Sequence, residues 1–339
     1  MRKMRLLVYD GLCIIISTRG PSVPSWNGRR NDARCLEMLS IIIPALNEQQ
    51  YLPSLLGSII RQSPSVAHEI VITDAGSQDR TVEIALSYGC TVVPGGLAAK
   101  GRNQGGKAAK GDLFLFLDPE VLLPHGFLKR ILSEFKERNL DIASCAIEPI
   151  VEKWMPRLTF PRFFFDLLYN WPARLSQNVF PYASAVLLVK KSIHEKLGGF
   201  NESIRIGEDH DYARRGAKYG RYGFLSSCKL PLFMRRCQKM GVLRTHLKYL
   251  LCNLLNALLG EVKSDIFKYN FGQYKGILSE EGKNRGPKWA LSLGWVTAYY
   301  ILLMVGLLSW SVFFLVLVSK LIFDRVGRLI ALRGAHDPL

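Results

Sequence analysis

The sequence predicts an α/β fold in which a mixed, mostly parallel sheet is wound with helices and followed by C-terminal membrane helices. Short apolar runs alternate with amphipathic stretches from residue 39 onward, which is typical of parallel strands connected by helices. The run at 113–117 contains only Leu and Phe, as expected for a strand buried on both faces. Residues 289–319 contain no charged side chain, which indicates a membrane segment.

The composition predicts a large core and a strongly basic surface. The chain has 339 residues, 48% of them hydrophobic, and a formal net charge of +17. Such an excess attracts nucleic acids, acidic lipid headgroups or phosphorylated substrates. No zinc-finger spacing or RNA-binding signature accompanies it, and much of it surrounds the most apolar segment. We therefore expect a membrane surface, and no nucleic acid, as a partner.

The seven cysteines are scattered without a C-x-x-C pair. This distribution argues against a zinc site or a disulfide framework and favours a reducing compartment. We expect these cysteines to fill the core.

The first 37 residues are expected to be disordered or dispensable. Residues 1–16 have a basic start and an apolar run, but Asp10 interrupts the run and no convincing cleavage site follows, which disfavours a signal peptide. Residues 17–37 are rich in Arg, Pro, Gly, Ser and Asn, a composition typical of unstructured chain. Residues 38–235 are then expected to form the folded domain.

Strands are expected where short apolar runs are bounded by turn residues. The expected strands are residues 39–43, 68–74, 90–93, 113–117, 141–147 and 185–189. Pro44 is expected to end the first strand, and Asp74 ends the second.

Helices are expected between these strands. After Asn47 and Glu48, one face of the first helix carries Leu52, Leu55, Leu56, Ile59 and Ile60. Further helical segments are residues 82–86 with Asp79 as a cap, the weakly helical and Gly-rich residues 95–111, and residues 124–137. A helix beginning near Gly207 has an acidic start and a basic continuation, which suits the helix dipole.

An aromatic and basic insertion, residues 154–174, separates the last two expected strands. Its aromatic side chains are interleaved with arginines and interrupted by prolines. This pattern fits a helix that covers the sheet, and it fits equally a lid that faces a membrane interface or an acceptor. The sequence leaves both alternatives open.

The C-terminal part is expected to associate with a membrane. Residues 236–288 are expected to be amphipathic and interfacial, residues 289–323 to cross the membrane, and residues 324–339 to form a basic tail. As one helix, residues 289–319 would extend about 47 Å, longer than a hydrocarbon core of roughly 30 Å, so one tilted span or a hairpin would fit. Basic residues on both sides slightly favour a hairpin with both ends cytoplasmic.

Two carboxylates, Asp118 and Glu120, follow the buried run at 113–117 with Pro119 between them. In open α/β sheets ligands bind at the carboxyl ends of central strands. Two acidic groups at this edge could hold a divalent cation with oxygen ligands, and the cation could hold a diphosphate. Alternatively, Asp118 caps a turn and Glu120 is solvated.

Five motifs in order resemble those of family 2 glycosyltransferases with the GT-A fold. They are IIIPALNE, EIVITDAGSQDRT, AKGRNQG, FLDPE and GEDHDYARR, which together span roughly residues 39–226. FLDPE stands where the family has its D-x-D motif, and GEDHDYARR is similar to the family's E-D-x-D/E-x-x-x-R helix.

The resemblance implies a site for a nucleotide-diphosphate sugar. Its donor-binding residues would be Pro44, Asn47, Glu48, Asp74, Gly76, Ser77, Lys100, Arg102, Asn103 and Asp118. Asp74 would accept a hydrogen bond from the base, with Glu48 near the ribose. Lys100 and Arg102 would neutralise the pyrophosphate.

The resemblance also implies a metal and a general base. Asp118 and Glu120 would hold Mn²⁺ or Mg²⁺. Asp209 would accept the proton of the attacking hydroxyl, and direct in-line attack inverts the anomeric centre. Its neighbours Glu208 and Asp211 could raise the pKa of the carboxyl group, and these two, with Arg215, would face the acceptor or the pyrophosphate.

The chain departs from the family pattern at two positions. Glu120 stands where the family usually has Asp, so the longer side chain makes the ligand assignment less secure. Ala75 stands where the family often has a second acidic residue, so base recognition would rest on Asp74 alone.

Together these features predict an inverting, metal-dependent hexosyltransferase, anchored in a membrane with its catalytic domain on the cytoplasmic side. A lipid-linked saccharide or polyprenyl phosphate, or a growing cell-surface polysaccharide, would be the acceptor. The competing hypotheses are a catalytically silent membrane-associated module that binds nucleotide sugars, and a sugar nucleotidyltransferase. A dinucleotide-dependent oxidoreductase is disfavoured because no G-x-G-x-x-G follows a strand.

Overall fold

The structure is a computed structural model of the chain. It describes residues 4–9, 12–17, 38–62, 66–150, 165–183, 185–204 and 207–235. The predicted interfacial segment, membrane segment and basic tail lie outside these residues, as does most of the aromatic insertion. Within the described ranges, no helix combines the length and the apolar character that a membrane crossing requires.

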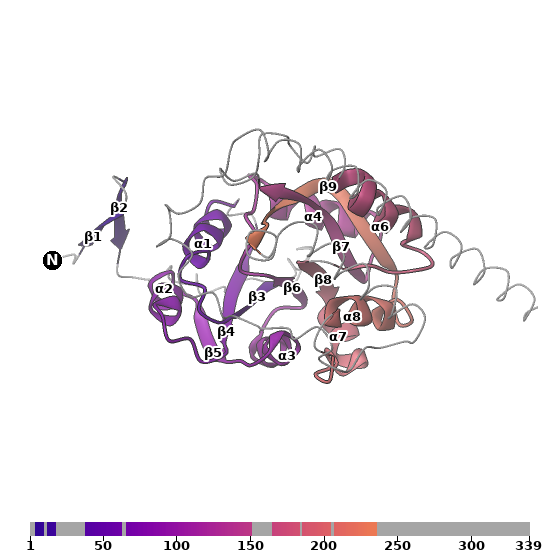
Figure 1. Cartoon of the computed structure of the whole chain (residues 1–339), viewed down its shortest axis with the longest axis horizontal. Helices are drawn as coiled ribbons and strands as arrows, with labels where there is room; N and C mark the ends of the chain where they lie inside the picture. The colour runs from indigo at the N-terminus through magenta and orange to yellow at the C-terminus, as the bar shows by residue number, and fades with distance from the viewer. Residues whose placement is uncertain are drawn as a thin grey trace, which may run out of the picture.

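A seven-stranded mixed sheet forms the centre of the domain, with strand order β5-β4-β3-β6-β8-β7-β9 (Figure 1). The strands are β3 (Leu39–Ala45), β4 (His68–Asp74), β5 (Thr91–Pro94), β6 (Leu113–Leu117), β7 (Ile142–Ile150), β8 (Val186–Lys190) and β9 (Tyr222–Phe233). Strand β8 runs antiparallel to β6 and β7, and the other neighbours are parallel. The prediction of a mixed, mostly parallel sheet is therefore confirmed.

Helices cover both faces of the sheet. They are α1 (Leu52–Ile60), α2 (Thr81–Ser87), α3 (Ala98–Ala108), α4 (Phe127–Glu137), the π-helix η1 (Asp166–Asn170), α6 (Trp171–Ser176), α7 (Lys191–Leu197) and α8 (Glu208–Gly216). Figure 1 shows α1 and α4 on one side of the sheet and α3, α7 and α8 on the other.

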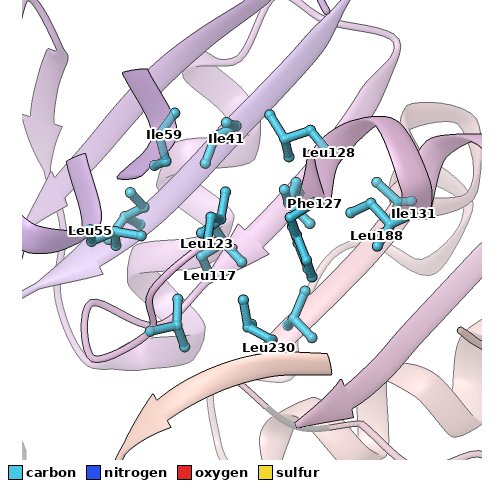
Figure 2. Close-up of a cluster of buried hydrophobic side chains, with 14 of the residues drawn as sticks. Ile41, Leu55, Ile59, Leu117, Leu123, Phe127, Leu128, Ile131, Leu188 and Leu230 are labelled. Atoms are coloured by element: carbon cyan, nitrogen blue, oxygen red, sulfur yellow. The ribbon is translucent and has the colours of Figure 1, made fainter. Parts of the chain in front are cut away.

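The apolar strand β6 divides its side chains between the two faces. Leu113, Leu115 and Leu117 join the cluster under α1 and α4, which Figure 2 shows, and Phe114 and Phe116 join the cluster under α3, α7 and α8. All five residues are buried. The prediction of a strand buried on both faces is confirmed, and the period of two explains why no polar residue interrupts the run.

Residues 4–17 contain a structure that the sequence did not predict. Strands β1 (Met4–Tyr9) and β2 (Leu12–Ser17) pair antiparallel as a separate two-stranded sheet. This pairing was not expected, and the expectation that residues 1–37 are disordered or dispensable stays a prediction.

Strands β3 and β9 differ from expectation. Strand β3 continues through Pro44 to Ala45 because beyond Ile42 it pairs only with β4, and a strand with one partner tolerates a residue that lacks N–H. Strand β9 was not predicted. The exposed Ser226 and Ser227 interrupt its apolar pattern, and pairing with β7 along most of its length supplies the hydrogen bonds that the local sequence does not indicate.

The chain reverses its winding direction between β3 and β6. It proceeds outward from β3 to β4 and β5, and then returns through α3 to place β6 on the other side of β3. The β3–β6 pairing ends at Ile42 and Phe116. Such a topological switch point opens a crevice at the carboxyl ends of the strands, where open α/β sheets bind ligands.

Helix α3 lies close to the sheet beside this switch point. A Cβ atom on Gly105 would lie 2.2 Å from Cγ2 of Ile42, and one on Gly101 would lie 3.0 Å from Oγ1 of Thr73. Only glycine permits this approach without rearrangement of β3 and β4. The approach brings the residues after Gly101 to the edge of the switch point.

A buried histidine lies under α8. The Nδ1 atom of His194 is 2.8 Å from the hydroxyl oxygen of Tyr212, and the ring packs against Phe114 and Phe116. Burial, with a smaller contribution from Arg215, lowers the pKa of His194 from 6.5 to about 4. The folded protein therefore keeps His194 neutral at pH values at which the unfolded chain protonates it.

This lowered pKa predicts a loss of stability in mild acid. As the pH falls below 6.5 the unfolded chain binds a proton that the folded protein excludes, which costs about 2 kcal/mol of unfolding free energy between pH 7.5 and pH 5. His194→Gln removes this titration, so its stability, measured by urea unfolding, should decrease less over that range. An equal decrease in both proteins would contradict the assignment.

Candidate functional site

The loops that follow β3 and β4 are joined by hydrogen bonds through Asn47 and Ser77. The backbone N–H of Asn47 donates to Oγ of Ser77 at 2.9 Å, and the N–H of Gln78 donates to Oδ1 of Asn47 at 2.8 Å. Asn47 has a φ of 56° and Gly76 a φ of 91°, so both are left-handed. The structure therefore brings Asn47, Gly76 and Ser77 together beside Pro44, as the sequence predicted.

Asp74 ends β4 and forms the turn that follows. Its carboxylate accepts hydrogen bonds from the N–H groups of Gly76, at 3.0 Å, and Ser77, at 3.0 Å from Oδ2. This is the Asx-turn that competes with base recognition as an explanation of the residue. The half-buried carboxylate retains further acceptor capacity at the edge of the sheet.

Arg102 is the cation at the centre of the site. It projects from α3 and is only 5% exposed. Its Nη2 atom is 2.7 Å from Oδ1 of Asp118, and its Nη1 atom is 2.6 Å from Oε1 of Glu208. Burial alone would lower the pKa of Arg102, but the two carboxylates outweigh it and raise this pKa above its ordinary value.

Lys100 and Asn103 are the other two residues of α3 that were predicted to bind the donor, and their environments differ from that of Arg102. Lys100 is exposed on the helix surface. Asn103 is buried and is used by the chain itself: its Oδ1 accepts from the N–H of Phe200 at 2.7 Å, and its Nδ2 donates to the carbonyl oxygen of Phe200 at 3.0 Å. Asn103 therefore holds the loop before α8, and its side chain does not line a donor site in this arrangement.

Glu48 is buried in an ion pair with Arg235. It is 3% exposed, and both of its carboxylate oxygens accept from Nη1 of Arg235, at 2.8 and 2.7 Å. Burial, opposed by Arg235 and reinforced by Glu120 and Asp118, raises the pKa of Glu48 to about 7. In the structure this carboxylate forms a buried ion pair, and its predicted contact with a ribose stays a prediction.

Asp118 and Glu120 point to different cations. Asp118 pairs with Arg102, whereas the buried Glu120 pairs with Nε of Arg235. Among residues 38–62, 66–150, 165–183, 185–204 and 207–235, no group of three or more His, Cys, Asp and Glu side chains is arranged to hold a metal ion. The two carboxylates therefore do not fit a cation held between them, and only Asp118, whose side chain is 25% exposed, remains accessible at the strand end.

The acidic start of α8 places its side chains in different environments. Glu208 is partly buried, with 13% of its side chain exposed, and is paired with Arg102. Burial raises the pKa of Glu208, Arg102 opposes that rise, and Asp209 adds to it. The side chain of Asp209 is 20% exposed, and its Oδ1 accepts from the N–H of His210 at 2.9 Å. Asp209 is therefore the accessible carboxylate at the start of α8, as Asp118 is at the end of β6.

Asp211 and Arg215 have structural partners. Nε of Arg215 is 2.7 Å from Oδ2 of the buried Asp211. The remaining nitrogens of Arg215 donate to the carbonyl oxygens of Leu197, at 3.2 Å, and Gly199, at 3.0 Å. The pair joins α8 to the end of α7, and the contact of these residues with an acceptor or a pyrophosphate stays a prediction.

Two features of the site were missed by sequence reasoning. Arg235 follows β9 and reaches Glu48, which is 187 residues away in the chain, so no local pattern indicates the contact. His210, the residue after Asp209, packs against Tyr182 with ring centroids 4.1 Å apart and the ring planes tilted by 32°. The aromatic and basic insertion, residues 154–174, was interpreted as either a covering helix or a lid. That pattern did not identify Tyr182.

Comparison with known proteins identifies the family. The family model of glycosyl transferase family 2 matches residues 40–197. An uncharacterized glycosyltransferase of Haemophilus influenzae is 27% identical over 188 residues, which cover 52% of this chain and 60% of that protein. Glucosyl-3-phosphoglycerate synthase of Mycobacterium tuberculosis is 30% identical over 115 residues, which cover 30% of this chain and 35% of that enzyme. The chain spans 55% to 60% of the length of the first curated relatives that it matches.

Two solved structures are similar in backbone. The structure of S. aureus TarS 1-349 in complex with UDP-GlcNAc has a TM-score of 0.47 and 21% identity, with coverage of 58% of each chain. The mannosyltransferase PcManGT of Pyrobaculum calidifontis, in complex with GDP-Man and Mn²⁺, has a TM-score of 0.47 and 20% identity, with coverage of 57% of this chain and 56% of that one. Residues 40–197 of this chain are therefore a region of the glycosyl transferase family 2 type, and the relatives that match the chain are named glycosyltransferases.

Proposed function

We propose that the protein transfers a sugar from a nucleoside-diphosphate sugar to an acceptor with inversion at the anomeric carbon. The match of residues 40–197 to glycosyl transferase family 2 supports glycosyl transfer as the reaction. The observation that carries the mechanism is the position of Arg102, a buried guanidinium that is paired with Asp118 and Glu208 and lies within electrostatic range of the accessible carboxylate of Asp209. A cation for a departing diphosphate then lies beside a base for an incoming hydroxyl.

The proposed chemical step uses these two residues. Asp209 accepts the proton of an acceptor hydroxyl while the hydroxyl oxygen forms a bond to the anomeric carbon. The bond between that carbon and the diphosphate oxygen breaks, and its electron pair leaves with the nucleoside diphosphate. The guanidinium of Arg102 stabilises the charge on the departing group by charge-assisted hydrogen bonds. The matched region ends at residue 197, so the role of Asp209 rests on this geometry and on the resemblance of α8 to the family helix.

The nucleoside is proposed to bind at the joined loops after β3 and β4. Asn47, Gly76 and Ser77 lie together at the carboxyl ends of these parallel strands, beside Asp74. A carboxylate at this position can accept hydrogen bonds from the N–H groups of a base. Lys100, on the surface of α3, supplies positive charge to the phosphates at longer range.

A divalent cation is proposed from the family resemblance and from the charge of the site. The carboxylates near the switch point are those of Glu48, Asp118, Glu120, Glu208 and Asp209. Among the residues that the structure describes, the guanidiniums of Arg102 and Arg235 are paired with carboxylates of this group. A diphosphate would add further negative charge to the site. Asp118 is the accessible oxygen ligand for Mn²⁺ or Mg²⁺, which would offset this charge when bound.

The acceptor is proposed to be a lipid-linked saccharide, a polyprenyl phosphate or a cell-surface glycan. The sequence of residues 236–339 supports a membrane location with the domain on the cytoplasmic side, where nucleotide sugars are made. The experiment that tests the function is incubation of the protein with labelled UDP-, GDP-, TDP- and ADP-sugars, membrane extract as acceptor, and Mn²⁺, Mg²⁺ or EDTA. Transfer of label from one donor is expected. Binding of a nucleotide sugar without any transfer would support the silent module instead.

Asp209→Asn should separate binding from turnover. Removing a general base typically lowers a rate by about 10² to 10⁴-fold, whereas Asp209 is not in the proposed nucleoside site, so the dissociation constant of the donor should change little. Initial rates and donor titrations measure the two effects.

Asp211→Asn on the same helix is the matched control. Asp211 pairs with Arg215, so this change should lower the melting temperature while turnover falls much less than in Asp209→Asn. Wild-type turnover in Asp209→Asn would remove this residue from the base role.

Asn103→Ala should lower the free energy of unfolding, whereas the affinity for the donor should change less. The change leaves the N–H and carbonyl groups of Phe200 without the side-chain partner that they have in the structure, at a cost of about 1–3 kcal/mol. Urea unfolding and donor titration at a temperature where the variant is folded check the prediction. Wild-type stability with lost donor binding would restore Asn103 to the donor site.

A further inference from the structure

A buried ion cluster bridges the two strands that separate at the switch point. Beyond Ile42 and Phe116 the strands β3 and β6 no longer pair with each other. Glu48 lies in the loop after β3 and Glu120 in the loop after β6. Arg235 binds both, through Nη1 to Glu48 and through Nε to Glu120. One guanidinium therefore spans the mouth of the crevice where backbone pairing has ended.

The three side chains are almost completely shielded from water. Glu48 is 3%, Glu120 6% and Arg235 8% exposed. The guanidinium also lies 5.5 Å from the ring centroid of Tyr51, which begins α1. A surface ion pair contributes little, but a guanidinium buried between two carboxylates fixes their separation, because moving either one leaves an unpaired charge away from water.

The end of β9 is attached to the same loops by its backbone and by an aromatic contact. The N–H of Phe233 donates to the carbonyl oxygen of Glu120 at 2.9 Å, and the N–H of Leu122 donates to that of Pro231 at 2.9 Å. The ring of Phe233 lies 5.3 Å from that of Tyr51. Strand β9 pairs with β7 at the sheet edge and then reaches the central loops, which places Arg235 between them.

We infer that Arg235 is a positioning residue that sets the width of the crevice between the β3 and β6 loops, with Glu48 and Glu120 as its two attachment points. Its relevance to catalysis rests on the proposed function, because the β6 loop carries Asp118 and the β3 loop carries Asn47. This assignment gives Glu120 a role other than that of a metal ligand. It also makes the proposed donor site depend on Arg235, the residue that immediately precedes residues 236–339.

Hydrogen exchange of the full chain in EDTA tests the inference without substrate or metal. Arg235→Met should accelerate amide exchange by at least about tenfold in both loop segments, residues 44–51 and 118–123, because each loses its ionic attachment. Glu120→Gln should accelerate exchange mainly in residues 118–123, since Glu48 keeps its partner. Arg235→Lys retains the positive charge but lacks the planar set of N–H donors of arginine. Its amide exchange rates in the two loop segments should lie between those of Arg235→Met and the wild type.

Arg138→Met is the matched control. Arg138 also joins a carboxylate, that of Glu134, to β9, but at the other end of that strand. It should lower the melting temperature without accelerating exchange in the two loop segments. Unchanged exchange in both segments of Arg235→Met, or equal acceleration in Arg138→Met, would overturn the inference. An unchanged Glu120→Gln protein in EDTA would leave Glu120 only the metal role and would also contradict it.

A second measurement tests whether the ion cluster of Glu48, Glu120 and Arg235 affects the proposed donor site. Calorimetric titration with UDP and GDP should give weaker binding in Arg235→Met, by about tenfold, and an unchanged dissociation constant in Arg138→Met. Partial recovery is expected in Arg235→Lys. If the wild type binds neither UDP nor GDP, the titration is made with TDP and ADP; if it binds none of the four, the proposed donor fails while the exchange measurement still decides whether Arg235 holds the loops.

Discussion

The site depends on a buried guanidinium that lies between segments far apart in the chain. Arg102 contacts Asp118 and Glu208, which are 16 and 106 residues away, so α3, β6 and α8 meet at one cation. Without its carboxylates this buried charge would be costly, and without Arg102 the two carboxylates would repel each other. The close approach of α3 to β3 and β4, which Gly101 and Gly105 allow, brings Arg102 to the switch point.

A second guanidinium, that of Arg235, repeats this arrangement across the same crevice. Arg102 connects the β6 end to α8 on the side of the proposed chemistry, and Arg235 connects the β3 and β6 loops. Asp118 and Glu120 are separated by Pro119, and in a strand two such side chains would lie on the same face. They belong to different clusters because the chain leaves β6 at Leu117 and turns at Pro119 and Glu120, so a pair that suggests a metal site in the sequence is divided in the structure.

Much of the fold could be predicted from the sequence because its signals are local. The strands β3, β4 and β6 are continuous apolar runs with clear ends, and the strand ends place Asp74 and Asp118 at one edge of the sheet. The partners of polar residues could not be predicted in the same way. Asn103 and Arg215 stand at family positions, but their side chains bond the backbone between Leu197 and Phe200, and Glu48 is bound by a residue that follows an unpredicted strand. These contacts depend on how distant elements pack, which residue spacing does not encode.

We propose that Arg102 binds the diphosphate of a donor at the switch point. The most direct test of this proposal is the affinity of Arg102→Lys for the nucleoside diphosphate that the wild type binds best, compared with its affinity for the corresponding nucleoside. Lysine keeps the buried charge but not the fork of donors, so diphosphate binding should weaken by about tenfold or more while nucleoside binding stays the same. Equal affinities of the variant and the wild type for the diphosphate would contradict the account.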